Sequence, residues 1–327
     1  MLVFSTESGL PVPPRALFIG AAPHRALETW PQVLGWQPFK PLADAWDRTG
    51  LPRVAEPPAD HWPLVLVLPG KSRDETLAWF ALARERLEPG GHLVVAMPNI
   101  AGAGRFEKEL ARATGTVISL QKNKCRAFHA HENSQWNEAV FKEWRELLAP
   151  RQIPETNFVT CAGIFSSAHI DPGSHLLAEH LPTTLRGRAA DLGAGWGYLA
   201  DAVLRLNPHL VALDLFEADS RALDCARQNL CHHAVNLSYH WHDVTRGLPE
   251  TYDAIVMNPP FHRGQVTDVD LGAAFLAQAA MALRRGGQLF LVANRQLPYE
   301  ALLNQHGYAW RAVAGHSTYK LFFAHRL

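Results

Sequence analysis

An amide, two prolines and an aromatic ring follow one another at Asn258-Pro259-Pro260-Phe261. The apolar run at 254–257 just before them predicts a buried parallel strand, and consecutive prolines cannot extend its hydrogen-bonded ladder. The chain must therefore leave the sheet at Asn258, at the carboxyl end of the strand, where open α/β sheets bind their ligands. The sequence thus predicts that these four residues lie at the functional edge of a sheet.

These residue types suit the alkylation of an exocyclic amino group. The Asn258 side-chain oxygen and the Pro259 carbonyl can each accept a hydrogen bond from an NH2 group, which would fix it and enrich its nitrogen in electrons. Phe261 offers a face on which a planar base or amide can stack. Asn-Pro-Pro is also a common strand-exit turn. The choice between the two interpretations therefore depends on motifs upstream.

A glycine-rich turn follows a second predicted strand, at 188–192. Its glycines have the spacing G-x-G-x-G, unlike the G-x-G-x-x-G of dinucleotide sites, and an acid stands two residues before the first of them. Glycines let a ligand approach the backbone closely, and the helix expected over 199–206 adds partial positive charge at its N-terminus. The pattern suits S-adenosylmethionine (SAM), which has no pyrophosphate. The expected binding residues are Asp191, Gly193, Ala194, Gly195 and Gly197.

Two further acids stand at the ends of the strands that follow. Glu217 ends the predicted strand 209–216 and can take two ribose hydroxyls; Asp214 is a rival, but it lies inside that strand. Asp243 follows the run 237–241 and can accept a hydrogen bond from an adenine amino group. Each acid alone is equally well explained as a helix cap or a solvated charge. Their order along successive strands favours a binding site.

The two halves of the chain echo one another. Residues 188–194 resemble 15–21, and 279–294 resemble 83–99, with 23 more residues between these landmarks in the second copy. Strands and helices alternate in both halves, which predicts mostly parallel sheets. We therefore predict a duplicated, doubly wound α/β fold, with chance similarity of two such halves as the alternative.

The two copies differ where chemistry would take place. The first copy has Gly20-Ala21-Ala22-Pro23-His24 in place of the glycine-rich turn, and Pro69-Gly70-Lys71-Ser72 in place of Asn258-Pro259-Pro260-Phe261. The first half is therefore expected to have lost cofactor binding and catalysis. The expected domains are a degenerate one at 1–140, a linker at 141–160 and a catalytic one at 161–327.

Composition restricts the class of protein. The chain has 327 residues, no net charge, and 47% hydrophobic and 19% charged residues, as expected of a globular protein. It contains no membrane-length apolar run and no signal peptide, and its four cysteines lack metal-ligand spacing, so we expect a reduced, cytoplasmic protein without a bound metal. Zero net charge argues against strong non-specific binding of nucleic acid. RNA contacts would need local patches, and the candidates, which an ordinary solvated face explains equally well, are Lys71, Arg73, Lys122, Lys124 and Arg126.

The motifs resemble those of class I SAM-dependent methyltransferases that act on an exocyclic nitrogen. Further stretches narrow the resemblance to bacterial rRNA guanine-N2 methyltransferases, in particular the small-subunit (16S) enzymes of the RsmC type, with their large-subunit sisters similar. These stretches are Gly163-Ile164-Phe165-Ser166, Asp171-x-Gly173-Ser174, Asn258 to His262, Val292-Ala293-Asn294 and Leu297-Pro298-Tyr299. The resemblance covers nearly the whole chain and implies two tandem Rossmann-like domains, the first degenerate.

The resemblance also implies a reaction and partners. A flipped-out guanine would stack on Phe261 and present N2 to Asn258 and Pro259, with Pro260 shaping the turn and Phe165, Ser166 and Asp171 forming a lid over SAM. His262 would assist or be structural, and Tyr319 would line the entrance or pack the last strand. The expected partner is rRNA in the 30S subunit or an assembly intermediate, without membrane or DNA, and the expected state is a monomer. The alternatives are 23S rRNA, a protein glutamine or adenine N6 as substrate, and an RNA-binding module that has lost catalysis.

Overall fold

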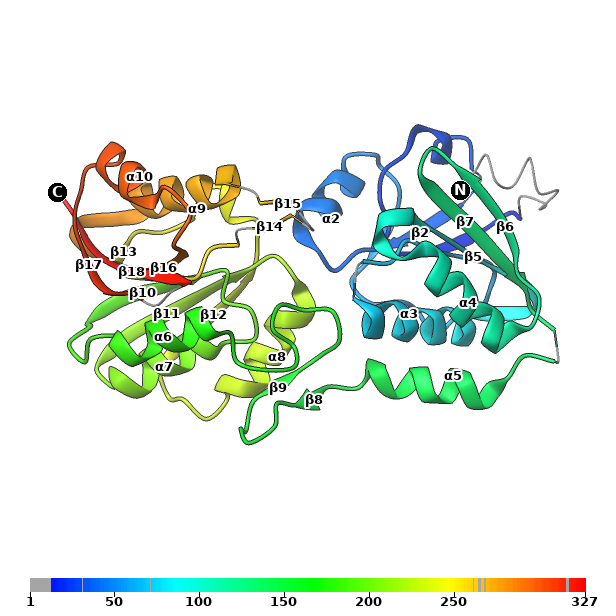
Figure 1. Ribbon diagram of the computed structural model, residues 1–327, viewed down its shortest axis with the longest axis horizontal. Helices are drawn as coiled ribbons and strands as arrows, with labels where there is room; N and C mark the ends of the chain where they lie inside the picture. The colour runs from blue at the N-terminus through cyan, green and yellow to red at the C-terminus, as the bar shows by residue number, and fades with distance from the viewer. Residues whose placement is uncertain are drawn as a thin grey trace. The chain divides into compact units, whose positions relative to one another are not determined.

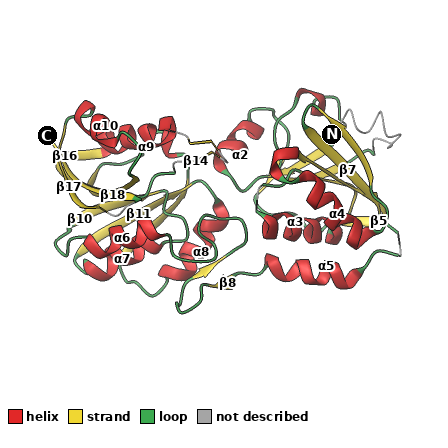
Figure 2. Ribbon diagram, in the orientation of Figure 1, coloured by secondary structure: helices red, strands yellow, loops and turns green. Residues whose placement is uncertain are grey.

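The computed structural model describes residues 13–30, 32–70, 72–133, 135–260, 262–263, 266–267, 269–315 and 318–327. The chain forms two compact units (Figure 1). The N-terminal unit comprises Met1–Pro150 with Cys161–Gly163, and the C-terminal unit comprises Arg151–Thr160 with Ile164–Leu327. Each is built from alternating strands and helices (Figure 2). The predicted α/β class with two tandem domains is therefore confirmed.

The predicted linker at 141–160 overlaps the N-terminal unit, which extends to Pro150. Helix α5, Glu138–Arg145, belongs to the N-terminal unit, where Phe141 and Trp144 are fully buried in the hydrophobic core. Asn137 caps the helix by accepting hydrogen bonds from the backbone N–H groups of its first turn. The polar, proline-containing composition of the stretch hid this short amphipathic helix.

The N-terminal unit contains a seven-stranded sheet in the order β3-β2-β1-β4-β5-β7-β6. Its strands are parallel except β7, which is antiparallel to both of its neighbours. The strands are β1 Ala16–Ile19, β2 Val33–Trp36, β3 Arg53–Val54, β4 Trp62–Val67, β5 Leu87–Pro98, β6 Ile118–Lys122 and β7 Cys125–His131. The other elements are η1 Arg25–Leu27, α2 Lys40–Asp47, α3 Arg73–Glu85, η2 Asn99–Ala101, α4 Ala103–Thr114 and η3 Glu146–Leu148.

The C-terminal unit contains a seven-stranded sheet in the order β12-β11-β10-β13-β16-β18-β17, in which β18 is antiparallel to both neighbours. The strands are β10 Gly187–Leu192, β11 Leu210–Glu217, β12 Asn236–Trp241, β13 Tyr252–Met257, β16 Leu283–Asn294, β17 Tyr308–Gly315 and β18 Tyr319–Arg326. Two short hairpins add β8 Arg151–Gln152, β9 Val159–Thr160, β14 His262–Arg263 and β15 Val266–Thr267.

Helices cover both faces of this second sheet, so its central strands are buried on both sides. Helices α6 and α7 lie on one face, and α9 and α10 lie on the other (Figure 1). The helices are α6 Pro172–His180, α7 Tyr198–Leu206, α8 Ser220–Leu230, α9 Val269–Ala282 and α10 Tyr299–Gln305, with the 3-10 turn η4 Val244–Arg246. None of the helices in the described parts of the chain combines the length and apolarity that crossing a bilayer requires.

The two sheets have the same strand order, with the seven strands of one corresponding in sequence to those of the other. Register makes the equivalence exact at residue level: Ile19 pairs with Trp36 and Val67, as Leu192 pairs with Phe216 and Met257. The residues after these strands are therefore equivalent, so Gln37 corresponds to Glu217 and Leu68 to Asn258. The sequence comparison had placed Pro69 opposite Asn258, one residue too far along.

The N-terminal copy keeps one of the hydrogen bonds found at the carboxyl ends of the strands in the C-terminal sheet. The Gln37 side-chain oxygen accepts the backbone N–H of Phe39 (3.0 Å), as Glu217 accepts that of Asp219 (2.9 Å). Among the described residues between its first two strands, however, the N-terminal unit has the three-residue turn η1, whereas the C-terminal unit has the nine-residue helix α7. The described part of this connection therefore contains no α-helix start equivalent to that of α7.

We predict that Gly35→Ala destabilises the N-terminal unit. A Cβ at this position would lie 2.5–2.8 Å from ring atoms of the fully buried Trp46, and such overpacking costs about 1–3 kcal/mol. Thermal unfolding should show the loss. Gly104→Ala is the control. Gly104 lies in helix α4, and a Cβ there would make an ordinary 3.6 Å contact with the Arg126 side chain, so stability should be unchanged or slightly higher. Equal stability of both variants would contradict this packing.

Candidate active site

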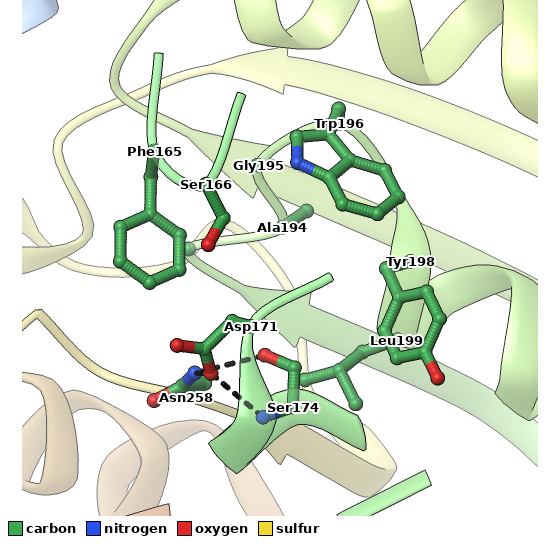
Figure 3. Close-up of a pocket in the computed structure, with 11 residues that line it drawn as sticks. Phe165, Ser166, Asp171, Ser174, Ala194, Gly195, Trp196, Tyr198, Leu199 and Asn258 are labelled. Atoms are coloured by element: carbon green, nitrogen blue, oxygen red, sulfur yellow. Dashed lines mark hydrogen bonds between the residues drawn. The ribbon is translucent and has the colours of Figure 1, made fainter. Parts of the chain in front are cut away.

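One pocket in the C-terminal unit gathers residues from the ends of several elements (Figure 3). Strands β10 and β13 are parallel neighbours, so the loops that leave their carboxyl ends start side by side. The N-terminus of α6 and the segment before it complete the walls. The lining residues are Phe165, Ser166, Asp171, Ser174, Gly193, Ala194, Gly195, Trp196, Tyr198, Leu199 and Asn258.

The glycine-rich loop is fixed against the neighbouring elements. Gly197 has φ +93°, and a Cβ there would lie 3.2–3.4 Å from Leu230 and Ala226 of α8, so only glycine lets the loop lie against that helix. The side-chain NH2 of Asn229, also on α8, donates to the Trp196 carbonyl (2.8 Å). The loop is therefore held in place before any ligand binds.

Asp191 lies beneath this loop and is fully buried. Neither of its carboxylate oxygens has a hydrogen-bond partner within normal distance. Burial raises the pKa of Asp191 to about 8, the nearby Glu217 carboxylate adds to the rise, and the backbone N–H of Ala200 opposes it. Asp191 is not among the residues that line the pocket, so its contact with the ammonium group of a bound amino-acid moiety stays a prediction. The glycine-rich loop, which does line the pocket, leads into the N-terminus of α7, and a tight loop before a helix start fits SAM at this position.

Glu217 lies at the end of β11, beside the pocket but not in its lining. Its two oxygens accept the backbone N–H groups of Gly195 (2.8 Å) and Asp219 (2.9 Å). Burial raises the pKa of Glu217, and these two N–H groups oppose the rise. Each oxygen keeps a second lone pair, so the ribose contact stays a prediction.

The rival acid Asp214 faces the interior of the sheet. It is fully buried, and its Oδ2 accepts hydrogen bonds from Arg188 Nη2 (2.7 Å) and Tyr252 Oη (2.9 Å). Burial raises the pKa of Tyr252, and its hydrogen bond to Asp214 adds to the rise. Asp214 therefore belongs to a structural ion-pair network of the core.

Asp243 has a local structural partner. Its Oδ1 caps the turn η4 and accepts both the backbone N–H (3.0 Å) and the hydroxyl (2.7 Å) of Thr245. Asp243 does not line the pocket. The helix-cap alternative is thus realised, and the adenine contact stays a prediction.

Asn258 follows strand β13 and lines the pocket, and two hydrogen bonds hold its amide group. Its Nδ2 donates to Asp171 Oδ2 and to Ser174 Oγ, both at 2.8 Å (Figure 3). Pro259 is buried and Pro260 is exposed. Phe261 lies outside the described residues, as does the side chain of His262, so their expected roles stay predictions.

The three residues expected to form a lid, Phe165, Ser166 and Asp171, have different surroundings in the structure. All three line the pocket, and the Phe165 side chain is 61% exposed beside it. Ser166 has φ +50°, a left-handed backbone conformation that is uncommon for serine. Asp171, however, caps helix α6 by accepting the Ser174 N–H (2.8 Å) and binds Asn258. Its carboxylate is thus directed at the Asn258 amide.

Sequence reasoning did not assign Ser174, Trp196, Tyr198 or Leu199 to the binding surface. The rings of Trp196 and Tyr198 pack edge to face with their centroids 5.7 Å apart, and the centroid of the Phe158 ring lies 5.1 Å from that of Trp196. Burial raises the pKa of Tyr198. Tyr198 and Leu199 are the first residues of α7, so the helix start marked by the last glycine was the signal for them.

The basic residues considered for RNA binding are partly neutralised in the N-terminal unit. Arg126 forms an ion pair with Glu107, and Arg73 lies 3.5 Å from Glu109. Lys122 and Lys124 are exposed at the β6–β7 turn, and Lys71 lies outside the described residues. The partly buried Tyr319 packs near Gly173 of the C-terminal unit, so it contributes to packing.

A second group of titratable residues lies away from the pocket. Asp201, His232 and His233 bring their ligand atoms within 4.8 Å of one another, with His233 Nε2 2.9 Å from Asp201 Oδ1. Arg205 Nε bonds the other Asp201 oxygen at 2.7 Å. A guanidinium beside the carboxylate opposes a second cation, so this arrangement is best described as a salt-bridge network.

Comparison with known proteins places these features in a family. A profile described as the methyltransferase small domain matches residues 155–323. Ribosomal RNA small subunit methyltransferase C of Psychromonas ingrahamii is 31% identical over 243 residues, which are 73% of this chain and 69% of that protein. The protein of that name from Shewanella sp. strain MR-4 is 30% identical over 269 residues, covering 81% and 78%.

A solved structure is also similar. The Thermus thermophilus 16S rRNA N2 G1207 methyltransferase (RsmC), in complex with AdoMet and guanosine, matches with a TM-score of 0.82 and 26% identity. The match covers 97% of this chain and 89% of that one, so it includes both units.

We predict that Asp191→Asn stabilises the protein increasingly as pH rises from about 4 to 8. The folded state holds a proton on Asp191 up to about pH 8, whereas the unfolded chain releases it near pH 4, so wild-type stability declines across this window. A neutral Asn avoids that loss. Thermal unfolding at several pH values measures the difference, and calorimetry should show SAM affinity reduced at least about tenfold.

The control for this prediction is Asp214→Asn. It removes the charge of the buried Asp214, whose partner Arg188 is 34% exposed, and should destabilise the protein by about 1–3 kcal/mol across the same pH range. A constant stability difference between wild type and Asp191→Asn over pH 4–8 would contradict the raised pKa of Asp191.

Proposed function

The chain belongs to the methyltransferase small domain family and, within it, to the small-subunit rRNA methyltransferases C, and from this premise we infer that it methylates the exocyclic N2 of a guanine in 16S rRNA with SAM as the methyl donor. One observation carries the chemistry. Asn258 stands in the same pocket as the glycine-rich loop, and its amide nitrogen is engaged by Asp171 and Ser174, which turns its oxygen away from both.

The residues around the loop are proposed to hold SAM, which supplies an electrophilic methyl group bound to sulfur. Asp191 would bind the ammonium of its amino-acid moiety, and the Gly193–Gly197 loop would lie against the ligand. Glu217 would take the ribose hydroxyls and Asp243 the adenine amino group. Phe165 and Ser166 would cover the ligand from the segment before α6. The support is the position of these groups at the carboxyl ends of neighbouring strands.

The catalytic step depends on positioning. The Asn258 oxygen and the Pro259 carbonyl would accept the two N–H groups of the target amine, which aims its nitrogen at the methyl group. A nitrogen–carbon bond forms while the carbon–sulfur bond breaks. The nitrogen becomes acidic as it is alkylated, so its proton can leave to water without a strong base. Orientation and fixed dipoles therefore supply most of the catalysis.

The N-terminal unit is proposed to serve RNA docking or stability, not catalysis. Phe18 stands at the position of Asp191, and Leu68 at that of Asn258, so neither the buried acid nor the amide is present. We further propose that the protein acts in the cytoplasm as a monomer, on the 30S subunit or its assembly intermediate. Guanine-N2 methylation of 23S rRNA is the alternative within the same chemistry.

We predict that the protein transfers labelled methyl from SAM to 30S subunits and that Asn258→Ala lowers the rate at least about a hundredfold, since the amine loses its fixed acceptor. The measurement compares 30S subunits, 50S subunits and naked rRNA, with the product identified as N2-methylguanine. Asn304→Ala, an exposed residue of α10, is the control and should retain full activity.

Each substrate in this comparison decides a different question. Label in 50S subunits would move the target to 23S rRNA and keep the chemistry. Label in protein or at adenine would overturn the guanine assignment. SAM binding without transfer to any substrate would mean a binding module that has lost catalysis.

A further inference from the structure

We propose that Asp171 is a positioning residue that fixes the amide orientation of Asn258 and thereby makes the site accept an N–H donor. The proposal rests on the proposed function, because the oriented oxygen is the group that would hold the target amine. Asp171 itself need not touch SAM or the substrate. It would act through Asn258, 87 residues along the chain.

The hydrogen bonds settle which end of the amide faces which way. An ionised carboxylate only accepts hydrogen bonds, so the Asn258 atom 2.8 Å from Asp171 Oδ2 has to be the NH2 group. Ser174 Oγ accepts the second hydrogen of that group, also at 2.8 Å. Both donor hydrogens are thereby used on one side, and the carbonyl oxygen has to lie on the other (Figure 3).

Asp171 is in turn held in place by its surroundings. It is only 9% exposed, and the oxygen that binds Asn258 also accepts the Ser174 N–H that begins helix α6. At Gly173 an added Cβ would lie 3.1 Å from this same oxygen and 3.0 Å from the Tyr319 ring. The carboxylate is therefore held by the helix start, and Gly173 leaves no free space for a side chain between it and the Tyr319 ring.

This arrangement has a consequence for specificity. If the amide could rotate by half a turn, its NH2 would meet the NH2 of the target, and neither group could accept a hydrogen bond from the other. With Asp171 in place the rotated form would bring the Asn258 oxygen against a carboxylate, which is repulsive. The site therefore favours an amino group over the acceptor atoms on the same guanine edge.

The test compares Asp171→Ala with Asp171→Asn in the full chain. The alanine removes the acceptor and should lower kcat about 10- to 100-fold, the factor expected for one hydrogen bond to a charged group, while SAM affinity changes less than about twofold. The asparagine keeps an oxygen at the same place and should retain most of the activity. In the Asn258→Ala background, Asp171→Ala should have no further effect on kcat.

A control separates this role from helix capping. Asn137→Ala removes a comparable side-chain cap from helix α5 and should lower thermal stability without changing kcat. Equal losses of kcat for Asp171→Ala in the wild-type and Asn258→Ala backgrounds would overturn the proposal. Equal losses for alanine and asparagine at 171 would do the same.

A second readout does not depend on activity. The side-chain NH2 of Asn258 should give a nitrogen–proton NMR signal with slowed hydrogen exchange, assigned by its disappearance in Asn258→Ala. Loss of that protection in Asp171→Ala supports the proposed orientation even if 30S subunits are not methylated, in which case only the proposed function fails. Unchanged protection in Asp171→Ala would overturn the orientation, whatever the activity.

Discussion

The parallel pairing of β10 with β13 is the constraint on which the catalytic unit depends. Leu192 lies beside Met257 at the last step of that pairing, so the glycine-rich loop and Asn258 leave the sheet as neighbours. Gly193 has φ +76°, and Asn258 lies close enough that a Cβ at Gly193 would be 4.0 Å from the Asn258 carbonyl. The glycine-rich loop and the Asn258 amide thus meet directly at the ends of two paired strands.

Much of this architecture could be predicted from the sequence because it depends on local rules. Double proline ends a strand, glycine spacing marks a tight turn before a helix, and alternating apolar runs indicate a parallel sheet. The same rules reveal the repeated strand order of the two halves. Residues such as Asp191 and Asn258 were found because their local motifs fix them to strand ends.

Features that depend on tertiary contacts could not be predicted in this way. The hydrogen bond between Asp171 and Asn258 joins residues far apart in sequence, so no local sequence pattern predicts it. Helix α5 was taken for part of a linker because only the packing of Trp144 reveals its buried face. The match of Leu68 to Asn258 needed strand register, since a sequence comparison tolerates a slip of one residue that a sheet does not.

Two copies of one topology in a single chain also create a problem during synthesis and folding. Strands that follow the same order in both halves can pair with the wrong half, and such misassembly is typical of tandem homologous domains. The central strands differ in a way that opposes it: Phe18 packs edge to face with Trp46 at 5.8 Å, whereas Asp191 occupies the matching place. Exchanging these strands would bury a carboxyl group against tryptophan in one half and force a phenyl ring under the glycine loop in the other. The difference between Phe18 and Asp191 thus also helps each half to recognise its own strands.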